Sequence, residues 1–89
     1  MTVSAYVLIQ TEIGRAASVA EAARRVEGVI SADDVTGPYD VIVRARSTSM
    51  DHLGGLVVSR LQTIEGIIRT LTCPVVDLGG QRGDLEEKP

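Results

Sequence analysis

The sequence predicts an α+β protein of the ferredoxin-like kind, in which a four-stranded antiparallel sheet carries two helices on one face. Three observations lead to this prediction. Residues 3–11 alternate between two faces, helical apolar stripes run over 19–26 and 53–64, and a glycine–proline turn joins two strands between the stripes. The element order is therefore βαββαβ, and two right-handed crossovers around a central hairpin give the strand order 4-1-3-2.

The first half of the chain contains a strand and a helix. Ser18 and Glu21 have the spacing of a capping box, so we expect the helix to begin at Ser18 and to end before Gly28. The strand over residues 3–11 is apolar on both faces, with Val3, Ala5, Val7 and Ile9 on one face and Tyr6 and Leu8 on the other.

The second half repeats this plan. Residues 29–36 and 40–46 form the hairpin strands, and one of the hydroxyl residues at 47–49 caps a helix that ends at Gly66. Residues 67–78 form the fourth strand, and Pro74 favours an edge position because proline cannot donate to a ladder. Gly54–Gly55 inside the helix costs about 1 kcal/mol per glycine relative to alanine, so it predicts a bend or a close neighbour.

Composition limits the class of protein. Eighty-nine residues make one domain, which we place at 1–78, followed by a glycine-rich, charged, flexible tail at 79–89. A net charge of −3 gives no basic surface for nucleic acid. A single cysteine and the absence of a long apolar run predict a cytoplasmic protein with no membrane span.

The predicted sheet leaves one face uncovered by helices. Apolar side chains from the first, third and fourth strands would lie on this face, and an exposed apolar surface of that size indicates an interface. Two sheets packed face to face about a two-fold axis would bury it, so we predict a dimeric α/β-barrel-like assembly.

Few residues carry recognisable chemistry. Asp40 lies three residues after the turn glycine Gly37, where it either satisfies turn amides or binds a ligand. Thr70 and Thr72 share one face of the fourth strand, either as ordinary β-branched residues or as hydroxyl ligands. Both alternatives stay open at this point.

The remaining polar residues predict no catalytic, metal or cofactor site. His52 has no second histidine, and the chain has one cysteine, so a metal site lacks ligands. We interpret His52 as a surface histidine and Cys73 as a small buried hydrophobe. Three arginines, at 44, 46 and 69, are interpreted as solvated or paired with acidic neighbours.

The segments Val35–Val43 (VTGPYDVIV) and Ile64–Thr72 (IEGIIRTLT), in this order and spacing, resemble the effector-binding (RAM) domain of the leucine-responsive regulator/AsnC (Lrp/AsnC) family of transcription regulators. The resemblance runs from about Val3 to Leu78. It implies dimers that assemble into octamers or decamers, with a small effector, usually an amino acid, bound between neighbouring dimers. The implied effector-binding residues are Gly37, Pro38, Tyr39, Asp40, Thr70, Leu71 and Thr72, with the Asp40 carboxylate receiving the ligand's ammonium and turn amides holding its carboxylate.

One departure from the family shapes the functional expectation. Full regulators carry a helix-turn-helix domain before this module, whereas here the first strand begins almost at once. We therefore expect a stand-alone, non-enzymatic module that modulates transcription regulation through ligand-linked assembly, without binding DNA itself. It would co-assemble with a full-length regulator or act alone. Pro38, where the family often has an acidic or polar residue, changes the expected ligand preference.

Two alternatives remain. One is a ligand-free assembly partner of a full-length regulator. The other is a small cofactor-free monooxygenase of the dimeric α/β-barrel type. Such enzymes resemble this chain in length, but they line a cavity with aromatic, histidine or asparagine side chains, and this sequence has two Tyr, one His and no Phe or Trp.

Overall fold

The computed structural model describes residues 2–76, and its elements follow the predicted βαββαβ order. The first half contains β1 (Val3–Thr11), α1 (Ala16–Arg24) and β2 (Val29–Asp34). The second half contains β3 (Val41–Ser47), a second helix in three consecutive parts, and β4 (Ile67–Pro74). The parts of the second helix are α2 (Met50–His52), η1 (Leu53–Val58) and α3 (Ser59–Leu61).

The four strands form one antiparallel sheet in the order β2-β3-β1-β4, which confirms the predicted order. β4 therefore lies at an edge, as Pro74 indicated. β2 is shorter than predicted because Val35 already belongs to the turn, where its amide donates to the Asp40 carbonyl at 2.9 Å. β4 ends at Pro74, so residues 75–76 do not continue the strand as predicted. The rest of the predicted strand, 77–78, and the predicted tail at 79–89 lie outside the described residues.

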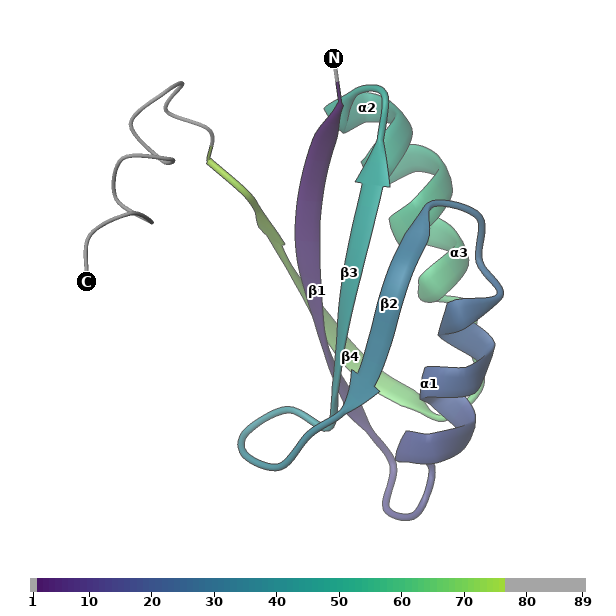
Figure 1. The fold of residues 1–89 in the computed structure, drawn as a ribbon. Coiled ribbons are helices and arrows are strands. Elements are labelled where there is room, and N and C mark those ends of the chain that lie inside the picture. The colour runs from purple at the N-terminus through teal and green to yellow at the C-terminus, as the bar shows by residue number, and fades with distance from the viewer. Residues whose placement is uncertain (1, 77–89) are drawn as a thin grey trace, which may run out of the picture.

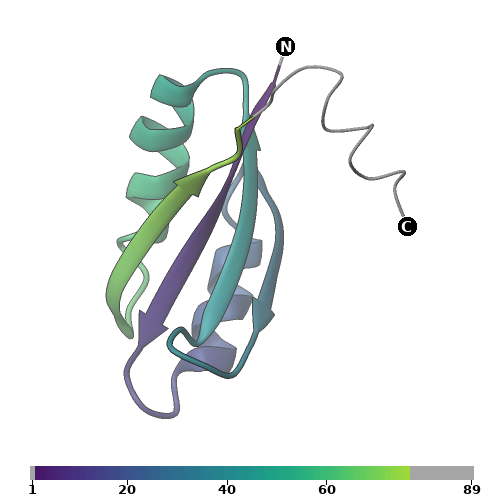
Figure 2. The same ribbon diagram turned by 90° about the vertical axis from the view of Figure 1, so that its left-hand side faces the viewer.

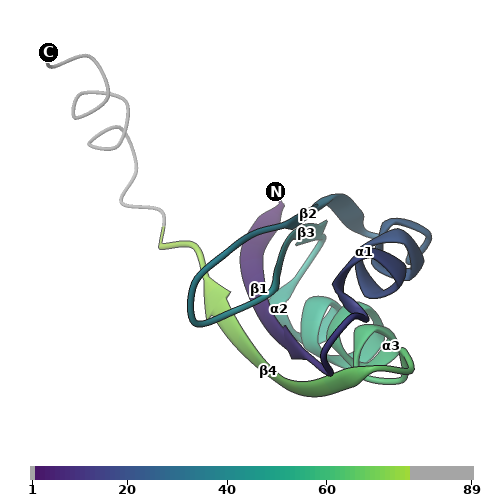
Figure 3. The ribbon, with the colours of Figure 1, turned by 90° about the horizontal axis from the view of Figure 1, so that it is seen from below.

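Both helices cover the same face of the sheet, as the view from below shows (Figure 3). The apolar core lies between these two layers. Alternate residues of β1 and β3 point into it, and one stripe from each helix meets them. Its largest fully buried side chains are Ile9, Leu53, Leu61, Val7, Val19, Val41, Val43 and Val57.

The other face of the sheet carries no helix (Figures 1 and 2). Leu8 lies at its centre, paired with Ile42 of β3 on one side and Leu71 of β4 on the other. On this face Tyr6 of β1 and Leu71 of the edge strand β4 keep 38% and 47% of their surface exposed. We call this surface, defined by Tyr6, Leu8, Ile42 and Leu71, the open face.

The predicted start of the first helix is wrong. α1 begins at Ala16, its N-cap is Arg15, and no side chain caps it. The Ser18 hydroxyl donates instead to the Arg15 carbonyl at 3.0 Å. A turn closed by the Arg15 amide donating to the Glu12 carbonyl leads the chain into the helix before Ser18 is reached. The helix also ends earlier than predicted, at Arg24, so Gly28 lies in the turn before β2.

The second helix is capped as predicted, but it contains an unpredicted π-helical segment and ends at Leu61, before the predicted end at Gly66. The Ser49 hydroxyl accepts from the His52 amide at 3.0 Å. Gly54 and Gly55 lie within the π-helical part, η1, and a Cβ added to either would meet nothing within 4 Å. The glycine pair therefore admits no close neighbour from the described part of this chain.

None of the helices formed by residues 2–76 has the length and apolar character needed to cross a bilayer.

Candidate functional site

The turn between β2 and β3 projects from the sheet on the side away from the helices (Figure 1). Its backbone is tied to β1, because the Asp40 amide donates to the Ile9 carbonyl at 2.9 Å. Gly37 has φ +131°, a conformation that side-chain-bearing residues rarely adopt, and a Cβ built there would meet nothing within 4 Å. The turn is thus fixed at its base and open at its tip.

Asp40 is half-buried and has a structural partner. Its carboxylate Oδ2 accepts from the Thr11 amide at 2.8 Å, which joins the turn to the end of β1 across 29 residues of sequence. An ionised carboxylate offers about four lone-pair sites, so one backbone donor leaves capacity for a ligand. The geometry therefore supports the structural role of Asp40 and remains compatible with the binding role.

The β4 residues of the predicted site divide between the two faces of the sheet. Thr70 and Thr72 are paired with Ile9 and Val7, whose side chains lie in the core, so both threonines are on the helix side. The Thr70 hydroxyl accepts from the Gln62 side-chain amide at 3.1 Å. Leu71 lies on the open face. Of these three β4 residues, Leu71 alone lies on the side of the sheet toward which the turn of the same chain projects.

Two further carboxylates, Asp33 and Asp34, stand at the end of β2 beside the turn. Among residues 2–76, the ion pairs are Arg15–Glu65 at 4.0 Å and Arg25–Glu21 at 3.8 Å, both well exposed to solvent. Arg44, Arg46 and Arg69 are exposed and take no part in these pairs, which agrees with the solvated alternative of the prediction. Arg44 lies over the Tyr6 ring instead, with its guanidinium carbon 6.0 Å from the ring centroid.

Neither His52, which is exposed, nor Cys73 lies in the core. Among the described residues, no group of three or more His, Cys, Asp and Glu is placed to hold a metal ion. Cys73 is only half-buried, and it lies on the open-face side of β4 opposite Tyr6, so the prediction of a buried hydrophobe is wrong for the single chain. Sequence reasoning also missed the Thr11 amide as a partner of Asp40, because a backbone group leaves no signal in residue type.

Comparison with known proteins identifies the family. The model of the Lrp/AsnC ligand binding domain matches residues 4–78. The chain belongs to the Lrp/AsnC ligand-binding domain family. The predicted family and the predicted ferredoxin-like fold are both confirmed.

Individual relatives agree with this assignment. An uncharacterised helix-turn-helix transcriptional regulator of Pyrococcus horikoshii is 32% identical over 54 residues, which make up 61% of this chain and 36% of that protein. The chain thus matches about a third of the length of the curated relative. A Thermus thermophilus protein of known structure superimposes with a TM-score of 0.78 at 28% identity, covering 86% of this chain and 96% of that one.

A third relative was solved with a ligand. The Neisseria meningitidis transcriptional regulator NMB0573, in complex with L-Met, shares the fold with a TM-score of 0.70 at 20% identity, covering 85% of this chain and 51% of that one. The chain is thus a ligand-binding domain of the Lrp/AsnC type, and curated proteins similar to it are named as transcriptional regulators.

Proposed function

We propose that this Lrp/AsnC domain binds an amino acid at the turn between β2 and β3 and that binding is linked to the assembly of several copies. The observation that carries the proposal is the position of Asp40. Its carboxylate is held at the base of a projecting turn by the Thr11 amide, 2.8 Å away. A carboxylate fixed in this way offers a preorganised partner for the ammonium group of an amino acid.

The turn also offers donors for the ligand's carboxylate. Within residues 2–76, no hydrogen bond uses the backbone amides of Gly37 or Tyr39. The open space around Gly37 leaves room for a ligand to approach them. Leu71 and the hydroxyls of Thr70 and Thr72 belong to the proposed site through the family resemblance, as does Pro38, which stiffens the turn. The L-Met complex of the N. meningitidis regulator supports the choice of an amino acid.

The open face supports the proposed homodimer. Leu8, Ile42 and Leu71 form an apolar row across three strands, and burying one such side chain fully is worth about 1.5–3 kcal/mol. Packing two open faces together about a two-fold axis would remove all of them from water. Further association of dimers into octamers or decamers would bring turns from neighbouring dimers together, with the effector between them.

Ligand binding and assembly would then depend on each other. A ligand held between dimers stabilises the assembly by about 2.7 kcal/mol per site at a hundredfold excess over Kd. By linkage, assembly must raise the affinity for the ligand by the same factor. A module of this kind would act on transcription by altering the oligomer of a full-length regulator with which it co-assembles.

A thermal-shift screen against the twenty amino acids at millimolar concentration tests the proposal. One amino acid, or a few of related chemistry, should raise Tm, and Asp40→Asn should abolish the rise. Asparagine is the matched variant because its carbonyl oxygen can still accept from the Thr11 amide while the charge is lost. A rise that is unchanged in Asp40→Asn would contradict the assignment of the site.

The open face also favours a second candidate function, a ligand-free assembly partner of a full-length regulator. That function needs the apolar row but not Asp40. A flat thermal-shift response from a protein that sediments as an oligomer would support it, and co-purification of a full-length Lrp/AsnC regulator would identify the partner.

A further inference from the structure

β2 forms one free edge of the sheet. It pairs with β3 on one side only, and α1 lies beside it (Figures 1 and 3). An unpaired edge presents backbone N–H and C=O groups to any extended chain, so proteins commonly protect such edges from pairing with another copy. The contacts of β2 show how this edge is protected.

The register of the hairpin identifies the backbone groups of β2 that face outward. The Val35 amide donates to the Asp40 carbonyl at 2.9 Å, so these two residues form a hydrogen-bonded pair at the end of the ladder. Hydrogen-bonded and non-hydrogen-bonded pairs alternate along an antiparallel ladder. Counted along the register from this pair, Ala32 and Asp34 belong to non-hydrogen-bonded pairs. Their N–H and C=O groups therefore face the free edge.

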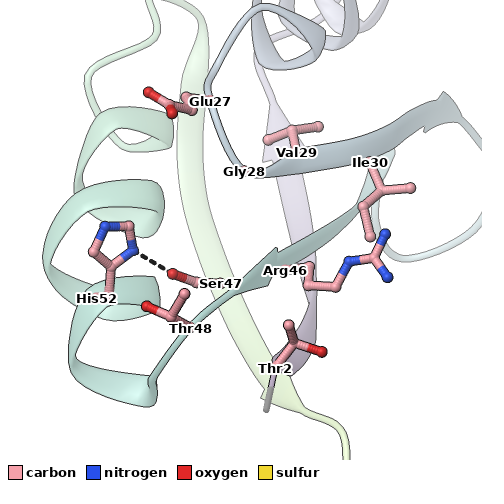
Figure 4. Close-up of a pocket in the computed structure, with 9 residues that line it drawn as sticks. All are labelled: Thr2, Glu27, Gly28, Val29, Ile30, Arg46, Ser47, Thr48 and His52. Atoms are coloured by element: carbon pink, nitrogen blue, oxygen red, sulfur yellow. Dashed lines mark hydrogen bonds between the residues drawn. The ribbon is translucent and has the colours of Figure 1, made fainter.

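A bulge shortens this edge. The register shifts between Val29 and Ser31, where two residues of β2 advance for one residue of β3. Ile30 is the extra residue, and its side chain lies on the opposite side of the strand from that of Val29 (Figure 4). The regular part of the edge thus consists of the outward groups of Ala32 and Asp34 alone.

Arg24 occupies one of these outward groups. It is the last residue of α1, and its Nε donates to the Ala32 carbonyl at 3.0 Å in a partly buried contact. A hydrogen bond from a guanidinium is charge-assisted and stronger than the bond between two neutral backbone groups. A strand that adds to this edge would have to displace the arginine from the carbonyl.

Asp33 places a charge at the same edge. A second copy that pairs through its own β2 uses all the outward groups in a single antiparallel register, with Ala32 of each copy opposite Asp34 of the other. That register puts Asp33 directly opposite the same residue of the other copy, in a non-hydrogen-bonded pair with Cα atoms about 4.5 Å apart. Like charges in this position destabilise strand pairing.

We propose that Arg24 and Asp33 close the edge of β2 against pairing with β2 of a second copy of this chain. Arg24 blocks a hydrogen bond that the pairing needs, and Asp33 repels its counterpart. Copies are then left to associate through other surfaces, without being linked sheet to sheet at this edge. The inference depends on contacts within one chain and does not rest on the proposed function.

A double variant of constant net charge tests the proposal. Arg24→Met/Asp33→Asn removes the blocking hydrogen bond and the opposed carboxylates. The matched control, Arg25→Met/Glu21→Gln, removes the exposed ion pair of the same helix. Each variant loses one cation and one carboxylate, so both keep the net charge of −3. All four positions are exposed, where substitutions rarely prevent folding.

Light scattering of the full chain over a range of concentrations gives the first readout. Arg24→Met/Asp33→Asn should reach at least twice the mass of wild type at the same concentration, and the control should keep the wild-type mass. Arg24→Met alone leaves the carboxylates opposed, so it should need a higher concentration than the double variant to associate.

Amide hydrogen exchange locates the new contact. The Ala32 and Asp34 amides face outward in wild type and should exchange roughly tenfold more slowly, or slower still, once the double variant associates. A destabilised chain that aggregates from its unfolded state would not gain protection at these two amides.

The contrary outcomes are equally specific. An unchanged mass for Arg24→Met/Asp33→Asn, or an equal rise in mass for the control, would overturn the proposal. A rise in mass without slower exchange at Ala32 and Asp34 would also overturn it, because the association would then use another surface. Equal association of Arg24→Met and the double variant would overturn the role of Asp33.

Discussion

Asp40→Ala is expected to destabilise the fold as well as to affect a ligand. The carboxylate accepts from the Thr11 amide at 2.8 Å, and Thr11 is only 7% exposed. Truncation leaves this buried amide without its partner, which costs about 1–3 kcal/mol. For a domain of this size, 1 kcal/mol lowers Tm by about 4–8 °C, so we expect a decrease of roughly 5–20 °C.

Asp40→Asn separates the two roles of this side chain. Its carbonyl oxygen can keep the bond to the Thr11 amide, so the decrease in stability should be about 1 kcal/mol or less, the difference between a charged and a neutral hydrogen bond. A thermal-shift assay on Asp40→Ala alone would confuse a lost ligand with a weakened fold. The asparagine variant avoids this confusion.

Urea unfolding followed by circular dichroism gives the comparison. Wild type, Asp40→Ala and Asp40→Asn are measured at one protein concentration, because association shifts apparent stability. The reasoning is refuted if Asp40→Ala unfolds within about 0.5 kcal/mol of wild type, the range typical of a surface substitution. It is equally refuted if alanine and asparagine destabilise the protein by the same amount.

Three further predictions concern packing and assembly. Gly28→Ala should lower the free energy of unfolding in urea by about 2–5 kcal/mol, because of left-handed backbone strain and overpacking against Val57. Gly14→Ala, at φ +81° in open space, should lower it by only about 1–2 kcal/mol. Equal decreases would show that Val57 moves aside freely. Gly54→Ala should stabilise the second helix by up to about 1 kcal/mol, because the added Cβ meets nothing within 4 Å. If size-exclusion chromatography instead shows that the variant no longer forms an oligomer, another copy of the chain packs at this position. For wild type we expect light scattering to give a mass of at least twice the 9.5 kDa chain, and Leu8→Asp should reduce it to a monomer. An unchanged mass for Leu8→Asp would exclude the open face as the interface.

The fold was predictable because its determinants are local patterns. Alternation over residues 3–11 and the helical stripes identify the elements, and the handedness of crossovers leaves few topologies for βαββαβ. The position of β4 at the edge followed from that topology and from Pro74. The start of α1 was not predictable in this way, because the turn at Glu12–Arg15 sets it, and Ser18 donates to a backbone carbonyl instead of capping.

The candidate site was predictable only as a list of residues. Sequence spacing put Gly37 and Asp40 in one turn, and the family resemblance added the β4 segment. Neither the spacing nor the resemblance could show that the Asp40 carboxylate accepts from the Thr11 amide, because that contact joins residues 29 positions apart and one partner is a backbone group. The sequence also could not show that Leu71 lies on the same side of the sheet as the turn while Thr70 and Thr72 lie on the other side. That difference depends on the face of the sheet that each residue occupies.

The sequence by itself determined the element order, the strand order, the family and an apolar surface without a helix to cover it. Each of these depends on the periodicity of side chains along one segment or on short motifs in a fixed order. Only the tertiary structure decided that Asp40 holds the Thr11 amide, that nothing in the described part of the chain packs against Gly54 and Gly55, and that Gly28 lies directly against Val57. These features depend on contacts between segments far apart in the chain, whose distances residue types and spacing do not specify.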